Sequence, residues 1–448
     1  MDLLSSEQHI NPNNIDTDLQ LYKKFSQGVR LPYEVLNIRN IPDGAKPGHF
    51  IEVRCGGFGS EISAHPKEKY QFYALTDRGP NTTYNVNQDH GKIFLDPDYT
   101  PKIGLFELKK DGTIQKIKEI LLKDPTGRNI TGLPNQHFGA SKEIAYDQDG
   151  KKLAIGTDEF GLDAEGLVAL KDGTFWVSDE YGPHIVHFNA DGLEIDRINA
   201  YVLDERRTSG YLLPQEYANR RQNRGMEGLT ITPDQKKLVG IMQSTMSNPD
   251  ASVSKSDLVR IVMIDLESKV VSQYLYQQEG GAKTYSNTAI TALSSTQFLV
   301  AERDDDFYKD NPQAFKRIYK INLQHATDLE KLKPSSTIRQ DEQFGLLIAE
   351  QTLEQYVLTA GWSGLAQQGI YPVEKTLVVD LVARLHYPHD KIEGLWVIDE
   401  QHLGVLNDDD YAFSETDGVL EQKYLDHDKN IIDGNTLYIL DQLDLTAD

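Results

Sequence analysis

The stretch EGLVALKDGTFWVSDEYG at residues 165–182 decides the fold, because the chain repeats its pattern several times. Each copy reads as a strand, a tight turn, a second strand and a polar or acidic end. Repeats of one supersecondary unit are typical of propellers and related arrays. The other copies are EGLTITPDQKKLVGIMQS at 227–244, AITALSSTQFLVAERDDD at 289–306, EGLWVIDEQHLGVLNDDD at 393–410 and, more weakly, EISAHPKEKYQFYALTDRG at 61–79.

The spacing of these copies predicts an all-β fold, a β-propeller. The copies at 165, 227 and 289 begin 62 residues apart, which suits one four-stranded blade with its loops. The intervals from 61 to 165 and from 289 to 393 are each 104 residues long, so either could hold a degenerate blade or a long loop. We therefore favour six blades, within a range of five to seven.

The repeats leave room for one domain only. Residues 1–30 are polar and are interpreted as an N-terminal extension, and residues 31–448 as a single propeller domain. An early strand near 50–54 is expected to pair with a C-terminal strand near 436–440. This pairing would close the ring and leave few exposed strand edges.

Two insertions interrupt the repeats, near 123–163 and 326–375. Two short helices are expected. One lies at 344–359, where the apolar residues follow a helical period, and the other at 19–24. Long loops on a rigid β scaffold often carry binding function. The insertions are therefore candidates for walls of a site.

Composition excludes several classes of partner. The formal net charge of −23 argues against nucleic acid, whose phosphates are bound by clustered positive charge. No apolar run reaches the length of a membrane span. Cys55 is the only cysteine, so no intramolecular disulfide can form. The N-terminus lacks the basic and apolar segments of a secretory signal. We expect a monomer that binds a small molecule.

Three glutamates recur at the same point of the repeat. Glu165, Glu227 and Glu393 each stand directly before Gly-Leu. The innermost strand of each blade lines the central channel of a propeller, so these side chains should converge. Clustered carboxylates raise one another's pKa values, and a divalent cation removes that repulsion. The glycine after each glutamate would let a neighbouring backbone approach closely.

The second strands end in a matching acidic set that should return to the same rim. The fourth repeat has Ala289 where others have glutamate, so Glu302 is expected to serve that blade. The alternative is that these carboxylates only cap backbone N–H groups. The predicted ligands of Ca²⁺, or of another divalent cation, are Glu165, Glu227, Glu393, Glu302, Asp77 and Asp408.

Basic residues accompany the acids: Arg78, Arg224, Arg303 and Lys391. They either offset the carboxylates as ion pairs or clamp phosphate or carboxylate oxygens, which the planar arginine fork suits. The sequence contains no GxSxG nucleophile elbow, P-loop or dinucleotide fingerprint.

These motifs together resemble the phytase-like family, which is named for an esterase-like activity of phytase. The resemblance extends over about residues 50–415 and implies hydrolysis of phosphate or other esters, in a periplasmic or secreted protein. The family's last motif usually reads NDND, and here NDDD adds the carboxylate of Asp409. The motifs that carry the resemblance are TDRGPN at 76–81, LDAEGLVALKDGTFWVSDEYGPHIVHFNADG at 162–192, NRGMEGLTITPD at 223–234 and HDKIEGLWVIDEQHLGVLNDDDYAF at 389–413.

The leading functional hypothesis is a metal-dependent ester or phosphoester hydrolase. A bound cation would lower the pKa of a water, and Glu180 or Asp179 would act as general base. Arg78, Arg224 or Arg303 would hold the departing anion. Two alternatives stay open: a non-catalytic binding propeller with structural calcium, and a lactonase-like hydrolase.

Overall fold

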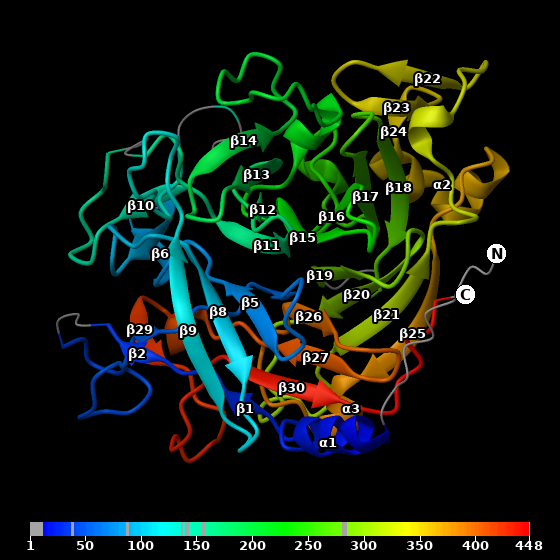
Figure 1. Ribbon diagram of the computed structural model, residues 1–448. Helices are drawn as coiled ribbons and strands as arrows, with labels where there is room; N and C mark the ends of the chain where they lie inside the picture. The colour runs from blue at the N-terminus through cyan, green and yellow to red at the C-terminus, as the bar shows by residue number, and fades with distance from the viewer. Residues whose placement is uncertain are drawn as a thin grey trace.

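The computed structural model describes residues 12–36, 40–86, 89–135, 138, 143–154, 158–279 and 285–447. Within these ranges the chain is built mainly of antiparallel sheets that surround a central axis (Figure 1). None of the helices found there is long and apolar enough to cross a membrane.

Five four-stranded antiparallel sheets form in the described residues, and we call them blades 1 to 5. In each blade the chain starts at the innermost strand and moves outward. Blade 1 contains β4 (Glu61–Ala64), β5 (Gln71–Leu75), β8 (Lys102–Leu108) and β9 (Ile114–Leu121). Blade 2 contains β11 (Ala164–Ala169), β12 (Phe175–Asp179), β13 (His184–Phe188) and β14 (Glu194–Ile198).

Blades 3 and 4 follow the same order. In blade 5 the outermost strand, β1, comes from the N-terminal part of the chain. Blade 3 contains β15 (Met226–Ile231), β16 (Lys237–Met242), β17 (Leu258–Asp265) and β18 (Val271–Gln277). Blade 4 contains β19 (Ser286–Ala292), β20 (Gln297–Arg303), β21 (Lys316–Asn322) and β25 (Glu374–Asp380). Blade 5 contains β26 (Gly394–Val397), β27 (Leu403–Leu406), β30 (Thr436–Leu440) and β1 (Val29–Arg30).

The innermost strands contact one another in cyclic order. β4 is next to β11, followed by β15, β19 and β26, and β26 returns to β4. This arrangement confirms the predicted β-propeller. Six blades were favoured from the sequence, and that number is not confirmed, since the described residues form five four-stranded sheets.

The two long intervals between repeats hold small sheets. The first interval carries a three-stranded sheet of β6 (Asn81–Val86), β7 (Asp89–Phe94) and β10 (Ile144–Tyr146). The second carries β22 (Ile338–Asp341), β23 (Gly345–Ile348) and β24 (Gln351–Thr352), followed by α2 (Leu353–Gln367). These small sheets and α2 lie in the two 104-residue intervals where the sequence allowed a further blade.

Ring closure uses an earlier segment than predicted. β1 pairs with β30, so that Val29 lies opposite Leu437. The predicted closing strand near 50–54 does not reach β30, and Arg54–Cys55 instead forms β3, which pairs with β2 (Glu34–Val35). Burial explains the choice, because Val29 packs on a buried cluster whereas Phe50 is 58% exposed.

The helices also differ from the predictions. The expected helix at 344–359 begins only at Leu353, because Ala349 and Glu350 take positive φ values of 47° and 64° and turn the chain into a hairpin. Thr352 then caps α2 through a capping box with Gln355. The helix expected at 19–24 is α1 (Pro12–Lys23), which contacts β30 of blade 5.

Short elements complete the described chain. The core lies between neighbouring blades, where Met226, Leu229 and Phe298 are 0–1% exposed. A hairpin of β28 (Phe413–Thr416) and β29 (Val419–Gln422) lies beside β6. The other elements are α3 (Leu381–Leu385) and the 3-10 helices η1 (Gln215–Asn219), η2 (Ala251–Val253), η3 (Leu329–Lys331) and η4 (Asp410–Ala412).

The α2 insertion is attached to blade 3 through buried charges. Arg260 of β17 donates from Nε to Oε1 of Glu354 on α2, over 2.9 Å. A second guanidinium nitrogen of Arg260 lies 3.4 Å from Oε1 of Glu216 on η1. The three side chains are between 0% and 4% exposed, so one cation neutralises two buried carboxylates.

Replacement of Arg260 by methionine is expected to lower the free energy of unfolding by about 3–5 kcal/mol, because two buried carboxylates lose their cation. Urea denaturation measures the change. The matched control is Arg339→Met, which breaks the exposed pair of Arg339 with Glu350 and should change stability little. Equal losses in the two variants would contradict the structural role given to Arg260.

Candidate functional site

A polar cavity of about 520 Å³ opens at one mouth of the central channel. Glu165, Glu227 and Glu393 line it, so the three glutamates of the repeat converge as the sequence predicted. A second, smaller cavity of about 260 Å³ lies farther along the same innermost strands, among residues such as Leu167 and Leu229. The glutamates therefore mark one end of the channel.

Each blade also contributes one side chain from the end of its second strand. These residues lie at the last position of the strand or within two residues after it. The residues at these strand ends and the glutamates of the innermost strands meet at one rim of the channel, as the direction of the strands implied. The five residues that line the cavity in this way are Asp77, Glu180, Gln243, Arg303 and Asp408.

Glu302 and Asp179 do not line the cavity. Successive side chains of a strand point to opposite faces, so Arg303 faces the cavity and Glu302 faces away from it. Glu302 is instead paired with Lys375 in the outer part of blade 4. The Oδ1 atom of Asp179 accepts a hydrogen bond from the backbone N–H of Asp163 at 2.9 Å, which holds the entry to β11. Glu302 therefore cannot ligate a metal ion in the cavity. Asp179 cannot act as a general base on a substrate bound there.

A misalignment of the fourth repeat by one residue explains why Glu302 was included. The pairing of β19 with β20 skips Thr288, just as the pairing of β15 with β16 skips Glu227. Thr288, rather than Ala289, is therefore the counterpart of the glutamate. Its hydroxyl donates to the backbone carbonyl of Ile392, so the first strand of blade 4 places no carboxylate at this position.

The glycines after the glutamates have the predicted role. A Cβ atom added to Gly166 would lie 2.6 Å from the backbone nitrogen of Leu229, and one added to Gly228 would lie 2.8 Å from that of Ile290. Real Cβ atoms do not approach backbone atoms this closely. Glycine therefore allows the innermost strands of blades 2, 3 and 4 to approach one another.

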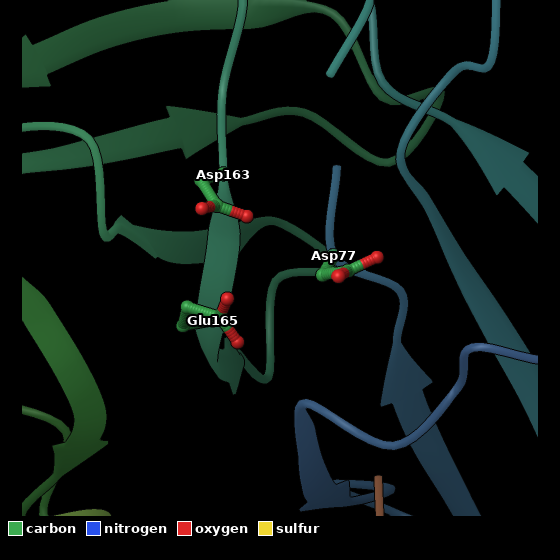
Figure 2. Close-up of side chains that lie close together, drawn as sticks. All are labelled: Asp77, Asp163 and Glu165. Carbon is green, nitrogen blue, oxygen red and sulfur yellow. The ribbon is translucent and has the colours of Figure 1, made fainter. Parts of the chain in front are cut away.

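Three carboxylates gather at the wall between blades 1 and 2. Asp77, Asp163 and Glu165 each offer an oxygen atom, and these atoms lie within 4.8 Å of one another (Figure 2). We call this group the acidic triad. Asp163 and Glu165 stand two residues apart at the start of β11 and so share a face, while Asp77 follows β5.

Asp163 is the member of the acidic triad that sequence analysis missed. Its side chain is 1% exposed, and within the described part of the chain no N–H or hydroxyl group donates a hydrogen bond to either carboxylate oxygen. Its one close cation is Arg78, whose guanidinium lies 3.2 Å from Oδ2. The signal was the spacing Asp-x-Glu in LDAEGL, because alternation places both acids on one face of a strand.

The electrostatics of the triad favour a bound cation. Burial, followed by the charges of Asp408 and Asp163, raises the pKa of Asp77 well above its ordinary value. Burial, followed by Glu227 and Asp163, does the same for the pKa of Glu165. The donors are all carboxylate oxygens, which Ca²⁺ and other hard cations prefer. The residues therefore fit a divalent cation.

Glu227 has a different environment, although it occupies the same position in its blade as Glu165. Burial raises the pKa of Glu227 to about 7, while Gln243 and Arg303 oppose the rise. Its Oε2 atom has no hydrogen-bond partner among the described residues, and the side chain lines the cavity. A carboxyl group that titrates near neutral pH is suited to general acid–base chemistry.

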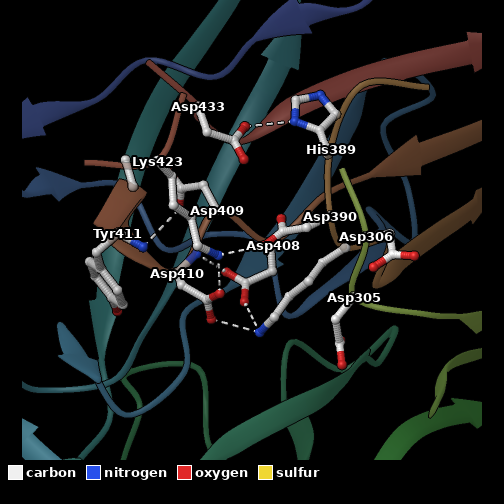
Figure 3. Close-up of polar contacts among 12 residues, drawn as sticks. Asp305, Asp306, His389, Asp390, Asp408, Asp409, Asp410, Tyr411, Lys423 and Asp433 are labelled. Atoms are coloured by element: carbon white, nitrogen blue, oxygen red, sulfur yellow. Dashed lines mark hydrogen bonds and ion pairs between the residues drawn. The ribbon is translucent and has the colours of Figure 1, made fainter. Parts of the chain in front are cut away.

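The blade 5 side of the cavity carries a network of lysines and aspartates (Figure 3). The Nζ atom of Lys391 lies 2.9 Å from Oδ2 of Asp408 and 2.6 Å from Oδ1 of Asp410. The Nζ atom of Lys423 lies 2.7 Å from Oδ2 of Asp390 and also pairs with Asp410. Asp410 therefore bridges two ammonium groups.

The backbone at Asp410 is strained. Asp410, Tyr411 and Ala412 have φ values of 46°, 58° and 64°, in the left-handed region that favours glycine. Such a conformation costs roughly 1–2 kcal/mol per residue. Asp409, the extra carboxylate of the last motif, does not line the cavity, and burial raises its pKa to about 8.

The basic residues of the cavity divide into two kinds. Arg78 pairs with Glu143 at 3.0 Å as well as with Asp163, and Arg303 pairs with Glu393 at 2.9 Å. Arg224 and Lys92 form no ion pair with a described residue. Toward described side chains, Arg224 donates one hydrogen bond, of 3.3 Å to the Ser286 hydroxyl. Burial lowers the pKa of Lys92. These two cations are available to a ligand.

We expect the metal-free protein to lose stability as pH rises from about 5 to 8. The folded-state pKa values of Glu227 and Asp409, about 7 and about 8, lie above those of unfolded carboxyl groups. The native state then holds protons that the unfolded state has released, so the free energy of unfolding falls with pH. Melting curves at stepped pH test this, and a melting temperature that rises across this range would contradict it.

Comparison with known proteins gives the family. A family model named Phytase-like and described as esterase-like activity of phytase matches residues 53–411. The chain belongs to the phytase-like family. A curated relative of this phytase-like protein is an uncharacterized secreted protein of Arthroderma benhamiae, 31% identical over 305 residues, which are 56% of this chain and 59% of the relative. The chain thus spans about three fifths of that relative's length.

Solved structures resemble the phytase-like chain only distantly. A luciferin-regenerating enzyme has a TM-score of 0.34 at 9% identity, covering 92% of this chain and 96% of its own. The periplasmic gluconolactonase of Pseudomonas aeruginosa has a TM-score of 0.30 at 12% identity, covering 68% and 80%. The β-propeller domain of Cps50 (Swd1) from Myceliophteria thermophila has a TM-score of 0.30 at 14% identity, covering 84% and 96%. Likenesses of this kind carry no argument about activity.

Proposed function

We propose that this phytase-like protein is a metal-assisted hydrolase of ester or phosphoester bonds that acts in the 520 Å³ cavity. One observation carries the proposal most strongly. Among the described residues no N–H or hydroxyl group donates a hydrogen bond to the buried Asp163 carboxylate, and its one cation, Arg78, is shared with Glu143. The carboxylate nevertheless lies within 4.8 Å of ligand atoms on Asp77 and Glu165. A group of this kind is stabilised by a cation.

The acidic triad would hold the cation, Ca²⁺ or another divalent metal. When bound, such an ion polarises an ester or phosphoryl oxygen and lowers the pKa of a water. This assignment differs from the predicted ligand set, because Asp163 joins it and the oxygens of Glu227 and Glu393 stand outside the 4.8 Å cluster.

Glu227 is proposed as the general base. Its free Oε2 atom would take the proton of the attacking water, and its pKa of about 7 makes both the uptake and the release of that proton feasible at neutral pH. Glu180, one of the two bases favoured from sequence, is less suited because burial, followed by the charges of Glu227 and Asp163, raises its pKa well above the ordinary value.

Arg224 and Lys92 are proposed to hold the anionic part of the substrate or leaving group. Both line the cavity, and neither forms an ion pair with a described residue. Arg78 and Arg303 would instead keep their carboxylate partners in place. A small-molecule ester with a phosphate or carboxylate group is the substrate class that these charges suit.

The secreted relative supports secretion for this protein as well. An extracellular location would supply calcium at the concentrations that carboxylate sites of moderate affinity require.

A substrate panel tests the proposal. The full chain is stripped of metal, and hydrolysis of a phosphate monoester, a carboxylic ester and a lactone is measured with Ca²⁺, Mg²⁺, Mn²⁺ or chelator. We expect metal-dependent turnover of a phosphate or carboxylic ester. Turnover of the lactone alone would favour the lactonase-like alternative. Tight metal binding without any hydrolysis would favour a binding propeller.

A further inference from the structure

Asp410 holds a central place in the cavity wall. Its Oδ1 accepts from Lys391 at 2.6 Å and its Oδ2 pairs with Lys423, so each oxygen serves a different ammonium group. The Asp410 side chain is 30% exposed, whereas that of Lys423 is 6% exposed. The carboxylate therefore lies at the cavity side of the pair of lysines.

Neither lysine needs Asp410 for charge balance. Lys391 also pairs with Asp408 at 2.9 Å, and Lys423 also pairs with Asp390 at 2.7 Å. Asp408 and Asp390 are more deeply buried than Asp410, with side chains 4% and 9% exposed. The two lysines would stay paired if the third carboxylate moved away.

The backbone also sets Asp410 apart. It is the first of three consecutive non-glycine residues with positive φ, and it directly follows Asp409, whose φ is −99°. Residues in such sparsely populated conformations persist when surrounding contacts determine them, and they cluster at ligand sites. Here the two lysine contacts and the burial of Tyr411 and Ala412 determine the turn.

We propose that Asp410 occupies an oxyanion subsite, and that a phosphate or carboxylate group of a ligand takes its place between Lys391 and Lys423. An oxyanion with two free oxygens can accept from both ammonium groups as the Asp410 carboxylate does. The displaced side chain has room in the 520 Å³ cavity. This subsite does not depend on the proposed metal or on hydrolysis.

An internal competitor weakens the apparent affinity of a ligand by the fraction of molecules in which the subsite is closed. Removal of the Asp410 charge should therefore tighten anion binding. Asp410→Asn is the suitable variant, because asparagine tolerates positive φ and keeps the shape of the side chain. Asp410→Gly is a second variant that suits the same backbone.

The experiment is calorimetric titration of inorganic phosphate, and separately of acetate, into the full chain after metal removal and dialysis into chelator-free buffer. We expect Asp410→Asn and Asp410→Gly to bind phosphate about tenfold more tightly than the wild type, since a repelling charge is removed. A matching gain for acetate would extend the subsite to carboxylates, and a gain for phosphate alone would restrict it to phosphoryl groups.

Two controls accompany the titration. Asp417→Asn changes an exposed aspartate with φ of 52° on the β28–β29 turn and should leave phosphate affinity unchanged. Adding Lys423→Gln to Asp410→Asn should abolish the gain. The proposal is overturned if neither Asp410 variant binds phosphate more tightly, or if the gain survives the loss of Lys423. Because metal is absent, these outcomes do not depend on the proposed hydrolysis.

Discussion

Glu227→Gln is expected to lower kcat by about 10²–10⁴-fold, the range that a general base contributes. Glutamine keeps the shape of the side chain and its hydrogen-bonding reach, but it cannot accept the proton of the attacking water. The substrate of the wild type that shows the fastest metal-dependent hydrolysis serves for the measurement. The affinity for the metal should change little, because Glu227 lies outside the acidic triad.

The pH dependence adds a second readout for Glu227. The base must be deprotonated to act, so kcat/KM should rise with pH through an acid limb at or below about 7, the pKa of Glu227. A positive ion in the acidic triad moves this limb to lower pH. Glu227→Gln should remove the limb.

The matched control for Glu227 is Glu61→Gln. Glu61 is also a glutamate at the channel, 2% exposed, and burial raises its pKa well above the ordinary value. It lines the second cavity rather than the first. Glu61→Gln should leave kcat within about threefold of the wild type, so comparable losses in the two variants would exclude the specific role of Glu227.

A second pair of variants separates glutamates that the sequence could not distinguish. Glu165→Gln should weaken Ca²⁺ binding by at least about 10–100-fold, because a charged oxygen leaves the acidic triad. Glu393→Gln should weaken Ca²⁺ binding by less than about tenfold, because the Glu393 carboxylate lies outside the acidic triad and pairs with Arg303 at 2.9 Å. Calorimetric titration of Ca²⁺ measures both.

The apo stabilities of the same two variants give an independent check. Loss of the Glu165 charge relieves repulsion among carboxylates, so the metal-free melting temperature should hold or rise. Loss of the Glu393 charge leaves the buried Arg303 with less compensation, so the melting temperature should fall. If both variants were destabilised without metal and both bound Ca²⁺ normally, the glutamates would only cap backbone N–H groups. This is the alternative that the sequence left open.

Much of the fold follows from the repeat itself. Each copy specifies two strands and a turn, and the glutamate before Gly-Leu marks the innermost strand. The number of blades was harder to predict, because small sheets such as β6, β7 and β10 fill intervals that suggested a further blade. Ring closure by Val29–Arg30 was missed because two residues carry no periodic pattern.

Site residues that belong to the repeat could be predicted from the sequence. Those outside the repeat could not. Glu165, Glu227 and Glu393 reach one cavity because equivalent strands surround one axis. Glu302 does not reach the cavity, and it was included because the sequence alignment placed Ala289, rather than Thr288, opposite the glutamates of the other repeats. Lys423 lies outside the repeats, and only the tertiary structure brings it to the cavity.

The most direct test of the central claim, that the acidic triad binds a divalent cation, is titration of Ca²⁺ into metal-free wild type and Asp163→Asn. Asp163 is the right residue to change, because it lies in the acidic triad and none of the described N–H or hydroxyl groups donates a hydrogen bond to its oxygens. We predict one saturable site in the wild type, and in the variant a loss of affinity of at least about 10–100-fold. The variant should still fold, because Arg78 keeps its pair with Glu143 at 3.0 Å. Equal Ca²⁺ affinity in the two proteins, or no Ca²⁺ binding by the wild type, would contradict the claim.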